Sequence, residues 1–170
     1  MPKFLNPGLR LERDYAGPDG NLSRKIVTLN SDIVPLAAFS GADRATKAWA
    51  ANDLIYLWKF PEGATIHEIA ALVYDVAASG DVLDVGHEQV GAGTWADDAD
   101  FFFADLSLAD AETVRSIGDP ASATGYGTRH APLIVNQPNV YLTATVVNAI
   151  AAGAQFGVRF YIDYEYTGNL

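Results

Sequence analysis

The stretch that decides the fold is FGVRFYIDYEY, Phe156–Tyr166, close to the end of the chain. Its large apolar side chains recur at every second residue, and charged side chains occupy positions between them. Successive side chains of a β-strand point to opposite faces, so this alternation predicts a strand with one buried and one solvent-exposed face. Such strands are typical of antiparallel sheets, because parallel sheets are covered on both faces.

Similar patterns recur along the chain. Thr65–Ala78 fits a helical stripe as well as a strand, and we predict a long strand because its end is rich in β-forming residues. About seven or eight strands separated by turns predict an all-β fold, an antiparallel β-sandwich or jelly roll. The other expected strands are Lys25–Leu29, Asp32–Val34, Val82–Gly86, Leu133–Val135, Val140–Val147 and Leu54–Phe60, the last with Leu54, Tyr56, Trp58 and Phe60 on one face.

Residues 97–119 are the exception to the strand pattern. Asp97, Asp98 and Asp100 crowd the start of this segment, where negative charge complements the dipole of a helix N-terminus. We therefore expect one or two short helices here, at the edge of a sheet.

The first 23 residues are predicted to form an extended N-terminal arm. Proline or glycine occupies six of these positions, no periodicity is sustained, and Pro18–Asn21 is typical of a turn. Residues 24–170 are then the β-sandwich or jelly-roll domain. A chain of 170 residues is long enough for one such domain with its own core.

The composition excludes several classes of protein. There are no cysteines, which excludes a disulfide framework, a zinc ribbon, a thiol nucleophile and an iron–sulfur cluster. The net charge of −10 argues against a nucleic-acid binder, since phosphate contacts need clustered Lys and Arg. The longest apolar run, Ile69–Tyr74, is far short of the ~20 residues that cross a bilayer. Pro7 and Arg10 interrupt any secretion signal.

Charge is divided unevenly along the chain. Residues 1–60 carry eight basic and six acidic side chains, whereas residues 61–170 carry three and fifteen. A basic front and an acidic body favour oriented docking on a charged partner, although the acids also suit a merely soluble surface. The basic residues expected to contact a partner are Arg10, Arg13, Arg24 and Lys25.

No catalytic motif is complete. His67-Glu68 lacks the second histidine of a zinc protease, because position 71 is Ala71. Gly91–Ala96 has the spacing of a dinucleotide loop, but aspartates that would repel a pyrophosphate follow it. Asp97, Asp98 and Asp100 are weak candidates for a calcium site, without the glycine and closing glutamate of an EF-hand. We expect no enzyme, no cofactor and no resident metal.

Four short motifs suggest a family. They are Phe60–Ile66 (FPEGATI), Leu83–Gly86 (LDVG), Asp97–Phe102 (DDADFF), and Leu142–Thr145 (LTAT) with Ala151–Val158 (AAGAQFGV). On these motifs residues 53–166 resemble small capsid-associated proteins of tailed bacteriophages, of the cement, decoration or head-fibre kind. The resemblance implies a β-sandwich or jelly-roll subunit without catalytic residues. It implies a virion protein, made in the host cytoplasm, that binds the major capsid protein on the outer surface of the head.

The resemblance also implies a homotrimer. An aromatic-rich final strand suits an apolar subunit interface, and its expected residues are Trp58, Tyr161, Tyr164 and Tyr166. The alternative function is a carbohydrate-binding module of a phage tail or head fibre, with two or more aromatic rings lining a shallow groove. A small hydrolase or isomerase would need His67, His87 or His130 to converge with acids in a pocket, which their spacing does not suggest.

Overall fold

The computed structural model describes residues 3–5, 23–30, 36–37, 49–75, 80–109, 111, 113–115, 132–151 and 154–166. Every regular element among them is a β-strand, and none is a helix that could cross a membrane. The strands are β1 Lys3–Leu5, β2 Ser23–Asn30, β3 Leu36–Ala37, β4 Leu54–Lys59, β5 Ala64–Asp75, β6 Val82–Gln89, β7 Asp98–Ser107, β8 Thr113–Arg115, β9 Leu133–Ile134, β10 Val140–Val146 and β11 Gly157–Tyr166.

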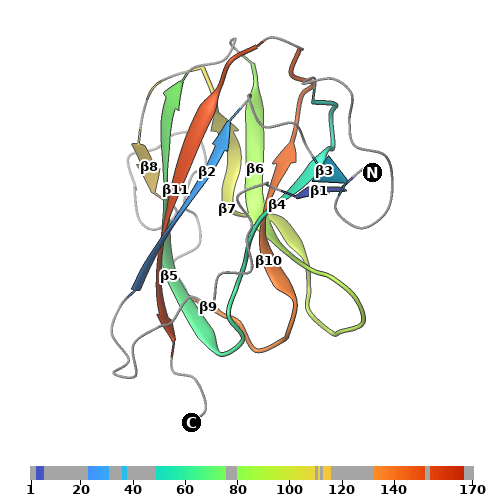
Figure 1. Ribbon diagram of the computed structural model, residues 1–170, viewed down its shortest axis with the longest axis vertical. Helices are drawn as coiled ribbons and strands as arrows, with labels where there is room; N and C mark the ends of the chain where they lie inside the picture. Colours follow the sequence, from blue (N-terminus) through green and yellow to red (C-terminus); the bar gives the residue numbers. More distant parts are fainter. Residues whose placement is uncertain are drawn as a thin grey trace.

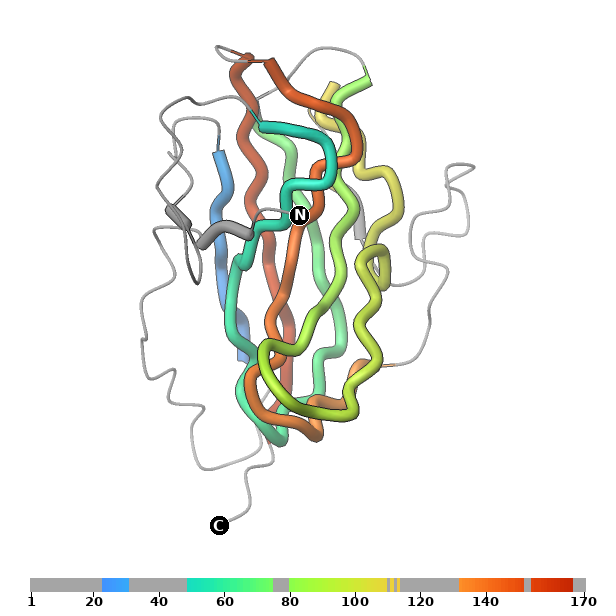
Figure 2. Tube along the Cα trace, turned by 90° about the vertical axis from the view of Figure 1, so that its right-hand side faces the viewer, coloured from blue at the N-terminus to red at the C-terminus, as the bar shows by residue number. Residues whose placement is uncertain are grey.

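These strands form two sheets that pack face to face (Figures 1 and 2). The six-stranded sheet has the order β3-β1-β4-β10-β6-β7. The five-stranded sheet has the order β2-β11-β5-β8, and β9 also pairs with β5. Every pairing is antiparallel except that of β1 with β4. The prediction of an antiparallel β-sandwich is confirmed, and jelly-roll connectivity stays a prediction.

The final strand lies at the centre of the five-stranded sheet, as its alternation predicts. Val158, Phe160 and Ile162 of β11 are fully buried, whereas Arg159 between them is exposed. The segment that fits either a helix or a strand is strand β5, which pairs with β11 along ten residues. Its inward side chains are aliphatic, so the sheet rather than a helix buries them.

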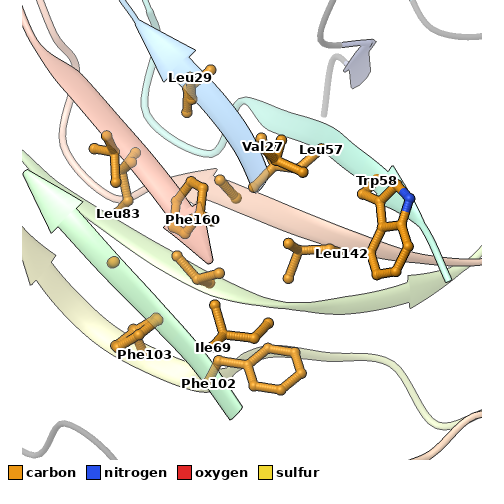
Figure 3. Packing of buried hydrophobic residues seen from close by; sticks show 14 of the residues in the cluster. Val27, Leu29, Leu57, Trp58, Ile69, Leu83, Phe102, Phe103, Leu142 and Phe160 are labelled. Atoms are coloured by element: carbon orange, nitrogen blue, oxygen red, sulfur yellow. The ribbon is translucent and has the colours of Figure 1, made fainter. Parts of the chain in front are cut away.

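The core fills the space between the two sheets (Figure 3). Phe160 and Ile69 come from the five-stranded sheet, and Leu142, Phe102 and Phe103 face them from the six-stranded sheet. Burying such side chains stabilises the fold by roughly 1.5–3 kcal/mol each relative to leaving them exposed. The core therefore combines side chains from strands that are far apart along the chain.

A β-bulge alters the expected faces of β4. The pairing with β10 shifts between Trp58 and Tyr56, which leaves Leu57 as the extra residue. Ile55 and Leu57 face the core before the bulge, and Trp58 and Phe60 face it afterwards. The expectation that four alternate residues share one face is wrong for this reason. Leu54 and Tyr56 lie on the outer side of the sheet, because they pair with Thr145 and Thr143.

The helix expected at residues 97–119 is also wrong for the described part of that segment. Asp98–Ser107 is the edge strand β7, and Thr113–Arg115 is β8. Phe102, Phe103 and Leu106 are buried, so tertiary packing and the β preference of aromatic residues outweigh the acidic start. Asp98 and Asp100 are charges on an edge strand, a common means of discouraging further strand pairing.

Part of the N-terminal arm is a strand. Lys3–Leu5 pairs in parallel with β4 and antiparallel with β3, and β2 begins at Ser23. The remainder of the predicted arm, with Arg10 and Arg13, lies outside the described residues. The division of the chain at residue 23 stays a prediction.

Candidate interaction surface

The outer side of the five-stranded sheet is exposed and carries an apolar patch. We call this surface the open face. Among the described residues, the exposed large hydrophobic side chains are Ile26, Tyr74 and Ile134, which are 52%, 44% and 64% exposed. All three belong to this sheet. Ile26 and Ile134 alternate with buried core residues, and Tyr74 lies at a bulge next to the buried Val73. Ile134 lies beside Thr65 at one end of β5, Ile26 is in the row of Ala70, and Tyr74 is near the other end of β5, so the exposed apolar side chains are spread along the length of this face.

Strand register places Ile26 in a row of apolar side chains that crosses the sheet. Ile26 of β2, Tyr161 of β11 and Ala70 of β5 lie directly opposite one another. The next row contains Arg159 and Leu72. Tyr161, Ala70 and Leu72 are half-buried, so the middle of the open face is apolar but remains accessible.

A second bulge holds an aromatic ring on the same face. β5 and β11 shift register at Gly157, which leaves Tyr74 as the extra residue of β5. The Tyr74 ring lies across Gly157, where a Cβ atom would approach it to 2.5 Å. The guanidinium of Arg159 lies 5.5 Å from the ring centroid, a cation–π distance. Glycine at position 157 therefore leaves room for Tyr74 to lie beside Arg159.

A charged row crosses the face next to the apolar middle. Arg24 donates two hydrogen bonds to Asp163, from Nε at 2.6 Å and from one terminal nitrogen at 2.7 Å. These bonds, followed by the charge of Asp163, raise the pKa of Arg24 above its usual value. Asp163 pairs in turn with Glu68 of β5. The row thus runs from positive on β2 to negative on β5, and His67 Nε2 lies 3.5 Å from Glu165 Oε2 at the same end.

The outer side of the six-stranded sheet is different, because its middle is already covered. Leu54, Tyr56, Thr143 and Thr145 are all buried there. The hydroxyl of Tyr56 donates a hydrogen bond of 2.9 Å to Glu88 Oε1. The open face is therefore the more accessible of the two outer sheet surfaces within the described residues.

The structure separates the four aromatic residues expected at a subunit interface. Trp58 and Tyr164 are 5% and 4% exposed and lie in the core, with ring centroids 5.3 Å apart. Tyr166 is half-buried against that core. Tyr161 lies on the open face. Trp58 and Tyr164 pack inside the chain, and Tyr161 is the member of the four that lies on the open face.

The basic residues expected to make contacts are also separated. Arg24 lies on the open face, and its side chain is 59% exposed. Lys25 is half-buried and shares the alternation of buried Val27 and Leu29, which places it on the opposite side of β2. Of the two described basic residues, Arg24 therefore lies on the same face as Tyr161. The two meet there because β2 pairs with β11.

The acidic candidates for a cation site do not converge. Within the described part of the chain, no three His, Asp or Glu side chains gather in a metal-binding arrangement. Asp97 Oδ1 accepts a hydrogen bond of 2.8 Å from the backbone N–H of Gln89, and so holds the β6–β7 loop.

An aromatic cluster around His87 was not anticipated. Trp95 Nε1 donates a hydrogen bond of 2.8 Å to His87 Nδ1, and the Phe101 ring centroid lies 4.8 Å from the imidazole. Gln89 reinforces the loop, because its Nε2 donates to Pro138 O at 2.9 Å. His87 follows Leu83 and Val85 at alternate positions, a signal of burial that could have revealed this cluster. His67 lies in the other sheet, and His130 lies outside the described residues.

Comparison with solved structures finds chains of similar fold. No protein-family model matches the sequence, and no curated protein matches it significantly. A chain of the capsid asymmetric unit of cyanophage Pam1 is similar, with 18% identity and a TM-score of 0.57 over 94% of both chains. A chain of the capsid of Ralstonia phage GP4 has 17% identity and a TM-score of 0.58 over 98% of this chain and 99% of that one. The chain thus shares its fold, along nearly its whole length, with chains from two phage capsids.

Proposed function

We propose that this chain is a non-enzymatic structural protein of a phage virion, a cement or decoration protein of the head. The observation that carries the proposal is the likeness of fold to two capsid chains, which covers nearly all of each chain. The protein would be made in the host cytoplasm and bind the major capsid protein on the outer surface of the shell.

The open face supports a role in contacts between proteins. It combines exposed apolar side chains with charged groups of both signs, which is the composition of an interface with an apolar middle and a polar rim. We propose that the assembled form is a homotrimer and that the open face contributes to it. Neither nucleic acid nor membrane is a partner in this proposal, in keeping with the net charge of −10.

We further propose that residues 1–23 contribute to docking through Arg10 and Arg13. A basic segment ahead of an acidic body can orient the subunit on an acidic shell and raise the rate of association. Lys3–Leu5 already forms a strand at the edge region of the six-stranded sheet, which gives the segment an attachment to the body. Deleting residues 6–22 tests whether the rest of the segment, which includes Arg10 and Arg13, is needed for docking on the head.

Binding to phage heads tests the function directly. Purified protein is mixed with heads of the parent phage that lack it, and bound protein is measured by co-sedimentation and located by cryo-electron microscopy. We expect saturable binding with density on the outer surface and greater resistance of the heads to heat. Heads that bind no protein, or density confined to the interior or the tail, would refute the cement assignment.

The carbohydrate-binding alternative has one observation in its favour. Tyr74 is 44% exposed beside Arg159, and Tyr161 lies on the same face, so two rings with polar neighbours are available to stack on sugars. A glycan array distinguishes the two functions. Glycan binding that is lost in Tyr74→Ala, together with a failure to bind heads, would favour the alternative.

A further inference from the structure

The charged row of the open face is ordered across the sheet, which constrains how two copies can pack. Arg24 lies on the edge strand β2, Asp163 lies on the central strand β11, and Glu68 lies on β5. Arg115 of β8 pairs with Ala70, one row further along the strands. Arg24, on the β2 side of the open face, therefore lies in the same row as Glu68 on the β5 side.

Rotation about an axis parallel to the strands keeps each row at its own height. In a ring built this way, the β2 half of one subunit meets the β5 half of the next. Arg24 then faces Glu68 of the next subunit, while Ile26 meets the row of Ala70. A twofold axis that crosses the strands at the row of Ile26 would instead stack β2 on β2 and bring Arg24 to the row of Thr28, Arg159 and Leu72, which contains no acid.

We propose that the open face is the subunit interface of the homotrimer, closed head to tail around an axis parallel to β11. Arg24 of each subunit lies opposite Glu68 of the next, and Ile26 and Tyr161 form the apolar middle of each contact. The inference rests on the proposed trimer and adds its interface and polarity. Such a contact differs on its two sides, which is the requirement for a closed ring with an odd number of subunits.

The apolar part is tested first. Ile26→Glu places a charge at an exposed position of the edge strand β2, where it costs the fold little but must be desolvated on assembly. Ala92→Glu, on the exposed β6–β7 loop, adds the same charge elsewhere and is the matched control. Light scattering should give three times the 18.2 kDa subunit mass for the wild type and the control. For Ile26→Glu we expect dissociation, with a rise of at least about ten-fold in the dissociation constant.

The charged part is tested by reversal. Arg24→Glu and Glu68→Arg should each weaken the trimer, because each creates a like-charge contact. The double variant should recover it, because every contact is again between opposite charges and Asp163 keeps a cation in its row. Circular dichroism and thermal unfolding at low protein concentration verify that each variant folds.

Mixing the two single variants tests the threefold ring itself. A ring of two can alternate the variants and satisfy both contacts, but a ring of three always retains one like-charge contact. We expect the mixture to recover less trimer than the double variant. A mixture that assembles fully into dimers would overturn the threefold arrangement.

Failure of the interface and failure of the function are distinguishable. An Ile26→Glu protein that folds and remains trimeric overturns the interface, whatever the result of binding to heads. A wild type that stays at the mass of one subunit on concentration overturns the trimer. Binding to phage heads is measured separately and can succeed in either case.

Discussion

Gly157→Ala tests how the open face holds the Tyr74 ring. A Cβ atom at this position would lie 2.5 Å from two ring carbons and 2.8 Å from the hydroxyl oxygen of Tyr74. These atoms form the far end of a side chain that is 44% exposed, so the ring can swing into solvent while the backbone stays in place. The variant should therefore fold and lose the stacking of Tyr74 on Gly157 and Arg159.

The magnitude follows from two opposing effects. Replacing glycine by alanine inside a strand stabilises by roughly 0.5–1 kcal/mol, because less chain entropy is lost on folding. Displacing the ring costs about 0.5–1 kcal/mol from the exposed cation–π contact, with a further loss of ring packing. Gly157→Ala should accordingly be neutral or slightly destabilising in the wild type. In a Tyr74→Ala background the same change should stabilise, because no ring opposes it.

A double-mutant cycle measures this coupling. The free energy of unfolding is obtained from urea titrations of the wild type, both single variants and the double variant, all at one protein concentration because assembly contributes to stability. We expect a coupling free energy of about 1–2 kcal/mol, within the range for residues in direct contact. A coupling below about 0.3 kcal/mol would show that the ring does not lie across Gly157 and would refute the reasoning.

Three further outcomes are expected. Trp58→Ala should lower the free energy of unfolding in urea by about 3–5 kcal/mol, because it empties a core site. The mass of the folded assembly should stay unchanged, and dissociation without loss of stability would place Trp58 at an interface. Trp95→Phe removes the Nε1–H that donates to buried His87, and should lower the free energy of unfolding by about 1–3 kcal/mol. An unchanged melting temperature would contradict that hydrogen bond. Burial raises the pKa of the Asp84 carboxyl, so the folded protein holds the carboxyl proton to higher pH than the unfolded chain does. The free energy of unfolding therefore falls as pH rises from the usual aspartate range through the raised pKa. Asp84→Asn should remove that fall and stabilise the protein at neutral pH, whereas an unchanged pH profile would show that Asp84 does not cause it.

The strands that alternation identified are those with one face on the core and one in solvent. β11 and β10 were expected almost residue for residue, because the two-residue period of a strand is visible whenever the two faces differ in polarity. At β5 a helical stripe fitted equally well, and the β-forming residues at the end of the segment favoured the strand.

The errors arose where local pattern and tertiary packing disagree. The acidic residues around the start of β7 are compatible with a helix start, and only the place of Phe102 and Phe103 between the sheets shows that the segment is a strand. Leu54 and Tyr56 were expected to share a face with Trp58 and Phe60, because strict alternation gives no sign of the bulge at Leu57. A bulge adds one residue and exchanges the two faces, and pairing with another strand is what reveals it.

The candidate site was only partly accessible to sequence reasoning. Arg24 and Tyr161 were selected separately, one for its charge and the other for its aromatic ring. Nothing in the sequence places them on one surface, because they lie far apart along the chain and meet through the pairing of β2 with β11. Ile26, Tyr74 and Ile134 were not selected at all, since an exposed apolar residue resembles a core residue until the other face of its strand is known.

The sequence by itself determined the class of the protein: an all-β chain without cysteines, with an acidic body and without a complete catalytic motif. These are properties of composition and of short-range period, and each can be evaluated within a few neighbouring residues. Only the tertiary structure decided which outer side of the sandwich is exposed and how its charges are ordered from β2 to β5. That order depends on register between strands distant in the chain, and register is selected by the packing of two whole sheets around one core.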